Sequence, residues 1–138
     1  MRFTKFLSTC LLVTLCSVAQ AEVAVIVHKD NSVELSKGKI KRVFMKKIKS
    51  FENGNEIHVV SLKEGHPIST EFNTRVLKKT ASKLKSYWSK LTFTGQAKPM
   101  EYIDTSEEMI SKVKADPNMI AYIDANKVTD EVRVLATF

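Results

Sequence analysis

The stretch of this sequence best suited to chemistry is a helix opening that follows Gly65. Pro67 is favoured at the first position of a helix, because its missing N–H would have no helical partner there. The free N–H groups of such an opening, together with the positive end of the helix dipole, favour an oxyanion such as phosphate or sulfate. The alternative is that the same groups only satisfy the helix end. The predicted oxyanion-binding residues are Gly65, His66, Ile68, Ser69 and Thr70.

Other catalytic and metal-binding patterns are missing from the sequence. The three histidines (His28, His58 and His66) lack the spacing of a metal site, and His58 lies in a predicted strand. There is no Gly-x-Ser-x-Gly nucleophile motif and no glycine-rich phosphate loop, and the chain has only four glycines. We therefore expect no metal, no cofactor and no enzymatic activity.

The N-terminus is typical of a secretory signal peptide. Arg2 and Lys5 precede the apolar run 6–18, and Ala19-Gln20-Ala21 forms an A-x-A cleavage site. The run is too short to span a membrane comfortably, and no later segment is long and apolar enough. A lipoprotein is disfavoured because Leu15, rather than a small residue, precedes Cys16. We predict a signal peptide over residues 1–21, a single mature domain over residues 22–138, and a periplasmic location.

Composition and charge narrow the class of partner. The chain has 138 residues, 43% of them hydrophobic and 27% charged, which are proportions of one globular domain. Its formal charge is +7, and both cysteines lie within the signal peptide. Because export makes nucleic acid an unexpected partner, we expect anionic small molecules, envelope polymers or acidic protein surfaces. The lysines of the candidate basic surface are Lys41, Lys46, Lys47 and Lys49.

Strands alternate with helices along the mature chain. The pattern predicts strands at 22–27, 57–62, 100–103, 119–123 and 132–135. It predicts helices after Ser36, from Pro67, after Thr80 and from Thr105, where Thr105-Ser-Glu-Glu108 is a capping box. The helix after Thr80 carries an apolar stripe, which predicts that Trp88 belongs to the core and not to a ligand site. This alternation predicts an α/β domain with a mostly parallel sheet flanked by helices.

From about Val33 to Asp124 the sequence resembles the phosphate-type substrate-binding proteins of bacterial ABC transporters, in particular small members with about one lobe. Tyr-Trp-x-x-Leu-x-Phe-Thr-Gly is the most specific piece. The residues that carry the resemblance are Leu35-Ser36, Ile40, Val43-Phe44, Lys47-Ile48, Phe51, Asn53-Gly54, Glu64-Gly65, Phe72, Val76-Leu77, Tyr87-Trp88, Leu91, Phe93-Thr94-Gly95, Pro117, Ile120 and Tyr122-Ile123-Asp124.

The resemblance implies a periplasmic-binding-protein-like α/β fold and a non-enzymatic protein that binds phosphate or a related oxyanion for an ABC transporter. Gly65 and Phe72 keep the family's spacing. Between them, His66, Pro67 and Ile68 stand where the family has Ser, Gly and Thr, which removes two hydroxyl ligands. The alternative is therefore an interaction module on the same fold, without a ligand, that binds an envelope protein or an anionic polymer through its basic surface.

Overall fold

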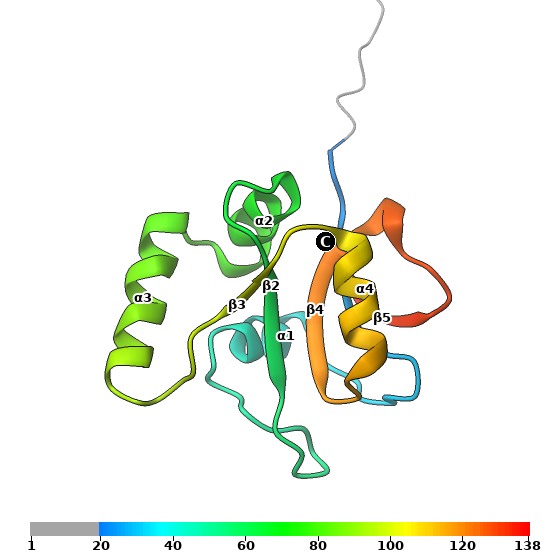
Figure 1. The fold of residues 1–138 in the computed structure, drawn as a ribbon, viewed down its shortest axis with the longest axis horizontal. Helices are drawn as coiled ribbons and strands as arrows, with labels where there is room; N and C mark the ends of the chain where they lie inside the picture. The colour runs from blue at the N-terminus through cyan, green and yellow to red at the C-terminus, as the bar shows by residue number, and fades with distance from the viewer. Residues whose placement is uncertain (1–19) are drawn as a thin grey trace, which may run out of the picture.

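The computed structural model of the chain describes residues 20–138 (Figure 1). The predicted signal peptide lies almost entirely outside the described residues, so its cleavage after Ala21 stays a prediction. In the part of the chain that the structure describes, no helix is long and apolar enough to cross a membrane.

Strands and helices follow one another in nearly the predicted order. The strands are β1 (Val23–His28), β2 (His58–Leu62), β3 (Glu101–Ile103), β4 (Met119–Asp124) and β5 (Val132–Thr137). The helices are α1 (Lys37–Phe44), α2 (Pro67–Phe72), α3 (Ala81–Phe93) and α4 (Ser106–Ala115), with a π-helical segment η1 (Asn73–Leu77) directly after α2 and a short 3₁₀ segment η2 (Ala125–Lys127).

The five strands form one sheet in the order β3-β2-β4-β1-β5. β2 pairs in parallel with β3 and β4, whereas β1 is antiparallel to both β4 and β5. Four strands thus share one direction, but two of the four strand pairings are antiparallel, so the sheet is mixed rather than mostly parallel as predicted. The α/β class is confirmed. The run 22–27 forms a buried strand as expected, but β1 is the one strand that runs against the others.

Local side-chain caps fix three of the helix starts. Ser36 accepts a hydrogen bond from the N–H of Lys39 at 3.3 Å, which begins α1. Thr80 and Thr105 cap α3 and α4 in the same way, at 3.3 and 3.1 Å. Each hydroxyl satisfies one N–H that the first helical turn leaves without a partner. These starts agree with the sequence-based predictions.

Helices α1 and α4 cover the two sides of the sheet, whereas α3 lies beside it, beyond β3 (Figure 1). An aromatic cluster joins α1 and α2 to the sheet. The ring of Phe72 stacks on Tyr122 with centroids 3.8 Å apart, and Phe44 packs edge-on against Phe72 at 4.7 Å. Helix α3 lies beside the sheet rather than over it, so its buried residues Leu84 and Trp88 both join the core and border a groove.

Candidate functional site

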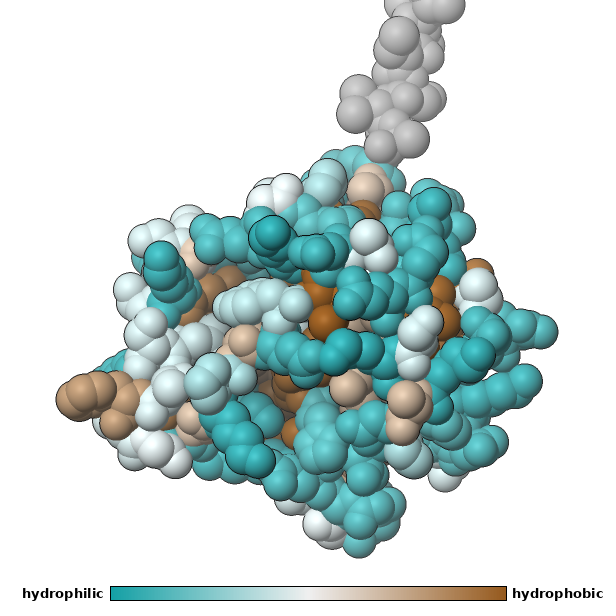
Figure 2. Space-filling model, in the orientation of Figure 1, coloured by the Kyte–Doolittle hydropathy of each residue, from teal (hydrophilic) through white to brown (hydrophobic). Residues whose placement is uncertain are grey.

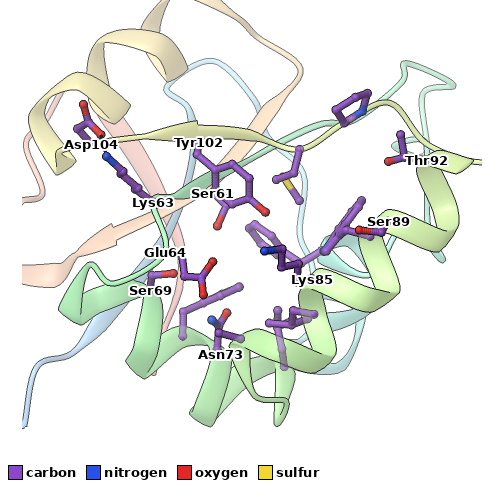
Figure 3. A pocket seen from close by; sticks show the side chains of 18 of the residues that line it. Ser61, Lys63, Glu64, Ser69, Asn73, Lys85, Ser89, Thr92, Tyr102 and Asp104 are labelled. Atoms are coloured by element: carbon purple, nitrogen blue, oxygen red, sulfur yellow. Dashed lines mark ion pairs between the residues drawn. The ribbon is translucent and has the colours of Figure 1, made fainter.

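A groove of about 910 Å³ separates α3 from the carboxyl ends of β2 and β3, and α2 and η1 close one end of it. Apolar and polar side chains both line it (Figure 3). The apolar lining comes from Phe44, Phe72, Leu77, Ala81, Leu84, Trp88, Phe93, Pro99 and Met100, and the polar lining comes from Ser61, Lys63, Glu64, Ser69, Asn73, Lys85, Ser89, Thr92, Tyr102 and Asp104. The groove has the size and composition of a small-molecule site.

Helix α3 supplies one wall of the groove. Its Tyr87 donates a hydrogen bond to the Met45 carbonyl at 2.6 Å, which ties the helix to the end of α1. Trp88 is 8% exposed, so the prediction that it is a core residue is confirmed. The same side chain lines the groove, and its small exposed part is therefore available to a ligand. Trp88 thus packs in the core and also lines the groove.

Three hydroxyl groups meet at the base of the groove. The hydroxyls of Ser61 and Tyr122 lie 2.6 Å apart, and Tyr122 lies 3.1 Å from the Ser69 hydroxyl. When the Tyr122 hydroxyl donates to Ser69, the Ser69 hydroxyl can donate its own proton to a ligand. In the opposite arrangement each hydroxyl donates to the next: Ser69 to Tyr122, Tyr122 to Ser61, and Ser61 to the Leu62 carbonyl at 3.2 Å. The Ser69 oxygen can then only accept a hydrogen bond from a ligand. The cluster can therefore donate or accept one hydrogen bond at Ser69.

Burial raises the pKa of the Tyr122 phenol above its usual value, although the hydrogen bonds with Ser61 and Ser69 act in the opposite direction. Because the buried environment disfavours the charged form, Tyr122 is a neutral phenol at physiological pH. The base of the groove thus presents neutral hydroxyls rather than a negative charge.

Charged side chains line the rim from both sides. Lys63 and Asp104 form an ion pair at 3.7 Å at the end of β2 and β3. Lys85 extends from α3 into the groove, and Glu64 stands on the opposite wall, near Ser69 (Figure 3). Among residues 20–138, neither Lys85 nor Glu64 forms an ion pair. Both remain available to a bound molecule.

The five predicted oxyanion-binding residues do not lie together at the groove. The His66 ring accepts a hydrogen bond from the N–H of Ile68 at 3.1 Å, and the N–H of Thr70 bonds to the His66 carbonyl at 3.1 Å. Gly65 has a φ of +88°, which permits the turn into the six-residue helix α2. Ser69 alone of the five lines the groove. The Ile68 and Thr70 amides are thus already hydrogen-bonded within the chain.

The sequence reasoning missed Ser61 and Lys85 as site residues. Ser61 is a polar residue within the otherwise apolar stretch 59–62 of β2, and this break in the apolar pattern could have marked it as a site residue. Lys85 belongs to a helix in which lysines alternate with apolar residues, and nothing in that pattern marks it as facing a groove.

Two of the four lysines that were predicted as a basic surface are engaged within the chain. Lys46 donates to the Ile57 carbonyl at 3.3 Å, and Lys49 donates to the Gln96 carbonyl at 3.2 Å. Burial lowers the pKa of Lys46, an effect that the nearby Glu56 partly offsets. Lys46 also has a φ of +54°, a conformation that disfavours residues other than glycine. At least half of this surface is therefore structural.

Comparisons with known proteins agree with this architecture. A family model described as "PBP superfamily domain" matches residues 15–137. Among the curated proteins, none matches the chain. A structure from Clostridium perfringens, described as a phosphate ABC transporter substrate-binding protein with bound phosphate, is similar over 83% of this chain, with a TM-score of 0.65 and 24% identity.

Two further structures have the same fold. An ABC-type phosphate transport receptor from Vibrio cholerae is 14% identical over 84% of this chain, with a TM-score of 0.66. PstS from Borrelia burgdorferi is 13% identical over 84%, with a TM-score of 0.61. The likeness covers 45%, 46% and 47% of the three chains, in the order given, so this chain spans less than half the length of each. At these identities the likeness shows the fold.

Proposed function

The chain belongs to the PBP superfamily, and from this premise we propose that it is an exported solute-binding protein without enzymatic activity. Its proposed solute is phosphate or a related oxyanion such as sulfate. The fold likeness to structures of proteins described as phosphate transport components supports this class of solute.

The hydroxyl cluster at the base of the groove is the observation that carries the proposal. Ser69 is 4% exposed, yet it lines the groove and holds a hydrogen bond with the buried Tyr122. A neutral hydroxyl that can donate, in a groove that an unpaired lysine enters, suits an oxyanion, because the lysine adds a charge-assisted hydrogen bond. Lys85 is that lysine. The oxyanion site proposed for Gly65, His66, Ile68, Ser69 and Thr70 is thus centred on Ser69, on the groove side of α2.

Location and partner follow from the same premise. A signal peptide ending at Ala21 would deliver the domain to the periplasm, where it would supply its solute to an ABC-type transporter. The groove is open to solvent in the described domain, and it is proposed as an open site on the surface of that domain. Hydrogen bonds in an open site are weaker than in a closed one, since water competes for them. We therefore expect weak binding.

Isothermal titration calorimetry of residues 22–138 against phosphate and against sulfate tests the proposal. Saturable heat with one site per chain is the expected result, and absence of heat at millimolar anion would overturn it. Ser69→Ala should weaken binding about tenfold, because it removes the donor and leaves Tyr122 without that partner. Ser89→Ala is the matched control, since Ser89 lines the groove from α3 and lies outside the hydroxyl cluster. Equal losses in both variants would argue against Ser69 as the donor.

A further inference from the structure

The groove is far larger than an inorganic oxyanion requires. Its volume of about 910 Å³ lies near the upper end of sites that hold drug-sized molecules. The hydroxyl cluster occupies only its base, and from there the lining continues as an apolar surface along α3. Leu77 of η1 and Leu84 of α3 line it and are 4% and 8% exposed, so each presents a small part of its side chain to the groove. A bound phosphate or sulfate would leave this apolar surface in contact with water.

Charge on the α3 side of the groove is of one sign. Residues 78–100 contain six lysines and no Asp or Glu. Within residues 20–138 none of these lysines forms an ion pair. An uncompensated positive wall attracts anions and raises their local concentration. Lys85 is the member of this set that enters the groove (Figure 3).

The opposite wall carries little net charge. Asp104 is paired with Lys63, which leaves Glu64 as the carboxylate of the groove lining without an ion-pair partner. Glu64 also contributes, after burial, to the raised pKa of Tyr102, as expected for a negative charge close to that phenol. An anion in the groove is thus attracted by Lys85 and opposed by Glu64.

Exposed aromatic side chains extend the apolar surface to the rim. Phe93 is 93% exposed at the end of α3, and Tyr102 is 52% exposed on β3. Figure 2 shows a hydrophobic projection where α3 ends. Both residues line the groove. Large exposed apolar groups beside an apolar groove are typical of a binding surface.

We propose that the groove binds an organic oxyanion, such as a phosphonate or a phosphate monoester, whose apolar body lies on Leu84 and Trp88 and whose anionic head lies between Ser69 and Lys85. This inference rests on the proposed function and adds the substrate class: the organic group is recognised as well as the oxyanion. The apolar body removes groove surface from water, and the head uses the hydroxyl cluster and the free lysine.

Trp88 supplies a direct readout, because it is the only tryptophan in the chain and lines the groove. Residues 22–138 are titrated with phenylphosphonate, inorganic phosphate and benzyl alcohol, and Trp88 fluorescence and heat are both recorded. Phenylphosphonate should bind about tenfold or more tightly than phosphate, since a buried phenyl ring adds apolar contact. Benzyl alcohol has the ring without the charge and should bind more weakly than phenylphosphonate.

Two substitutions with opposite expected effects test whether Lys85 and Glu64 act on the anionic head of phenylphosphonate. Lys85→Met should weaken phenylphosphonate binding about tenfold, and Glu64→Gln should tighten it severalfold, because it removes the opposing charge. Lys83→Met is the matched control: Lys83 lies two residues away on α3 but does not line the groove, so its loss should change affinity less than about twofold. Weaker phenylphosphonate binding after Glu64→Gln would overturn the proposal, since it would show that Glu64 supports the bound anion rather than opposing it.

The outcomes separate this inference from the proposed function. If phosphate binds and phenylphosphonate binds no more tightly, the organic group is not recognised, and the inference fails while the proposed function stands. If benzyl alcohol binds as tightly as phenylphosphonate, the groove does not select anions and the inference fails. Vesicles of phosphatidylglycerol and of phosphatidylcholine form a further arm. A Trp88 response to the anionic vesicles without any response to soluble phenylphosphonate would replace the small-molecule site with a lipid surface.

Discussion

The ring of Tyr122 stacks on the ring of Phe72, with centroids 3.8 Å apart and planes 9° from parallel. This contact joins the central strand β4 to the end of α2. It places the phenol hydroxyl of a fully buried residue between Ser61 and Ser69, at the base of the groove. A phenylalanine at position 122 keeps the aromatic stack and removes the hydroxyl, so the two contributions can be tested separately.

Tyr122→Phe should lower the free energy of unfolding by about 1–3 kcal/mol, since it leaves the buried Ser69 hydroxyl and the half-buried Ser61 hydroxyl without their shared partner. Tyr122→Leu should cost more, because it also removes the aromatic stack. Urea denaturation followed by circular dichroism measures both. If the two variants unfold at the same urea concentration, the stack contributes nothing to stability.

Trp88→Ala should lower the free energy of unfolding by about 3–5 kcal/mol, as for other buried aromatic residues. Trp88 is 8% exposed and packs beside Tyr87, with ring centroids 6.0 Å apart. Trp88→Phe, which keeps an aromatic ring in the core, is the comparison and should lose much less. A wild-type denaturation midpoint with an unchanged slope for Trp88→Ala would show that α3 gains no stability from this side chain.

Acid should destabilise the protein in part through Asp116. Burial raises the pKa of this carboxyl, but the hydrogen bonds from His58 at 2.6 Å and from the Asn118 N–H at 2.9 Å outweigh it, and the pKa lies below the ordinary value of 3.8. A depressed pKa stabilises the fold above the unfolded-state value, and that contribution is lost as the pH falls through the folded-state pKa. Melting temperature against pH from 6 to 2 should therefore fall less steeply in Asp116→Asn. If the melting temperatures of the wild type and Asp116→Asn fall with pH at the same slope, other groups cause the acid sensitivity.

The secreted protein should begin at Glu22, because Ala19-Gln20-Ala21 is the predicted cleavage site. Intact mass spectrometry of the protein from the periplasm of a Gram-negative expression host measures this. A mass that retains Met1, or a chain that starts at an acylated Cys16, would contradict the prediction. An Ala21→Leu substitution should block processing and keep the precursor mass.

Helix starts were predictable because their causes are local. Ser36, Thr80 and Thr105 each cap a helix through a hydrogen bond to a residue three positions along the chain. Such a bond depends on the side chain and on a few neighbouring backbone groups. The apolar run at residues 22–27 likewise predicted a buried strand. The expectation of parallel neighbours was wrong for β1, which is antiparallel to β4 and β5, because burial on both faces does not by itself decide the direction of the neighbouring strands.

The groove depends on contacts between distant parts of the chain. Ser69 was predicted from the helix opening, but its partners come from β2 and β4, and Tyr122 lies 53 residues away in sequence. Lys85 became a site residue because α3 lies beside the sheet rather than over it (Figure 1). The sequence by itself determined the class of fold, the helix starts and the residues to be buried, since propensity, caps and periodicity act over a few residues. Only the tertiary structure decided which of those residues surround a common space, because that depends on how the sheet orders its strands.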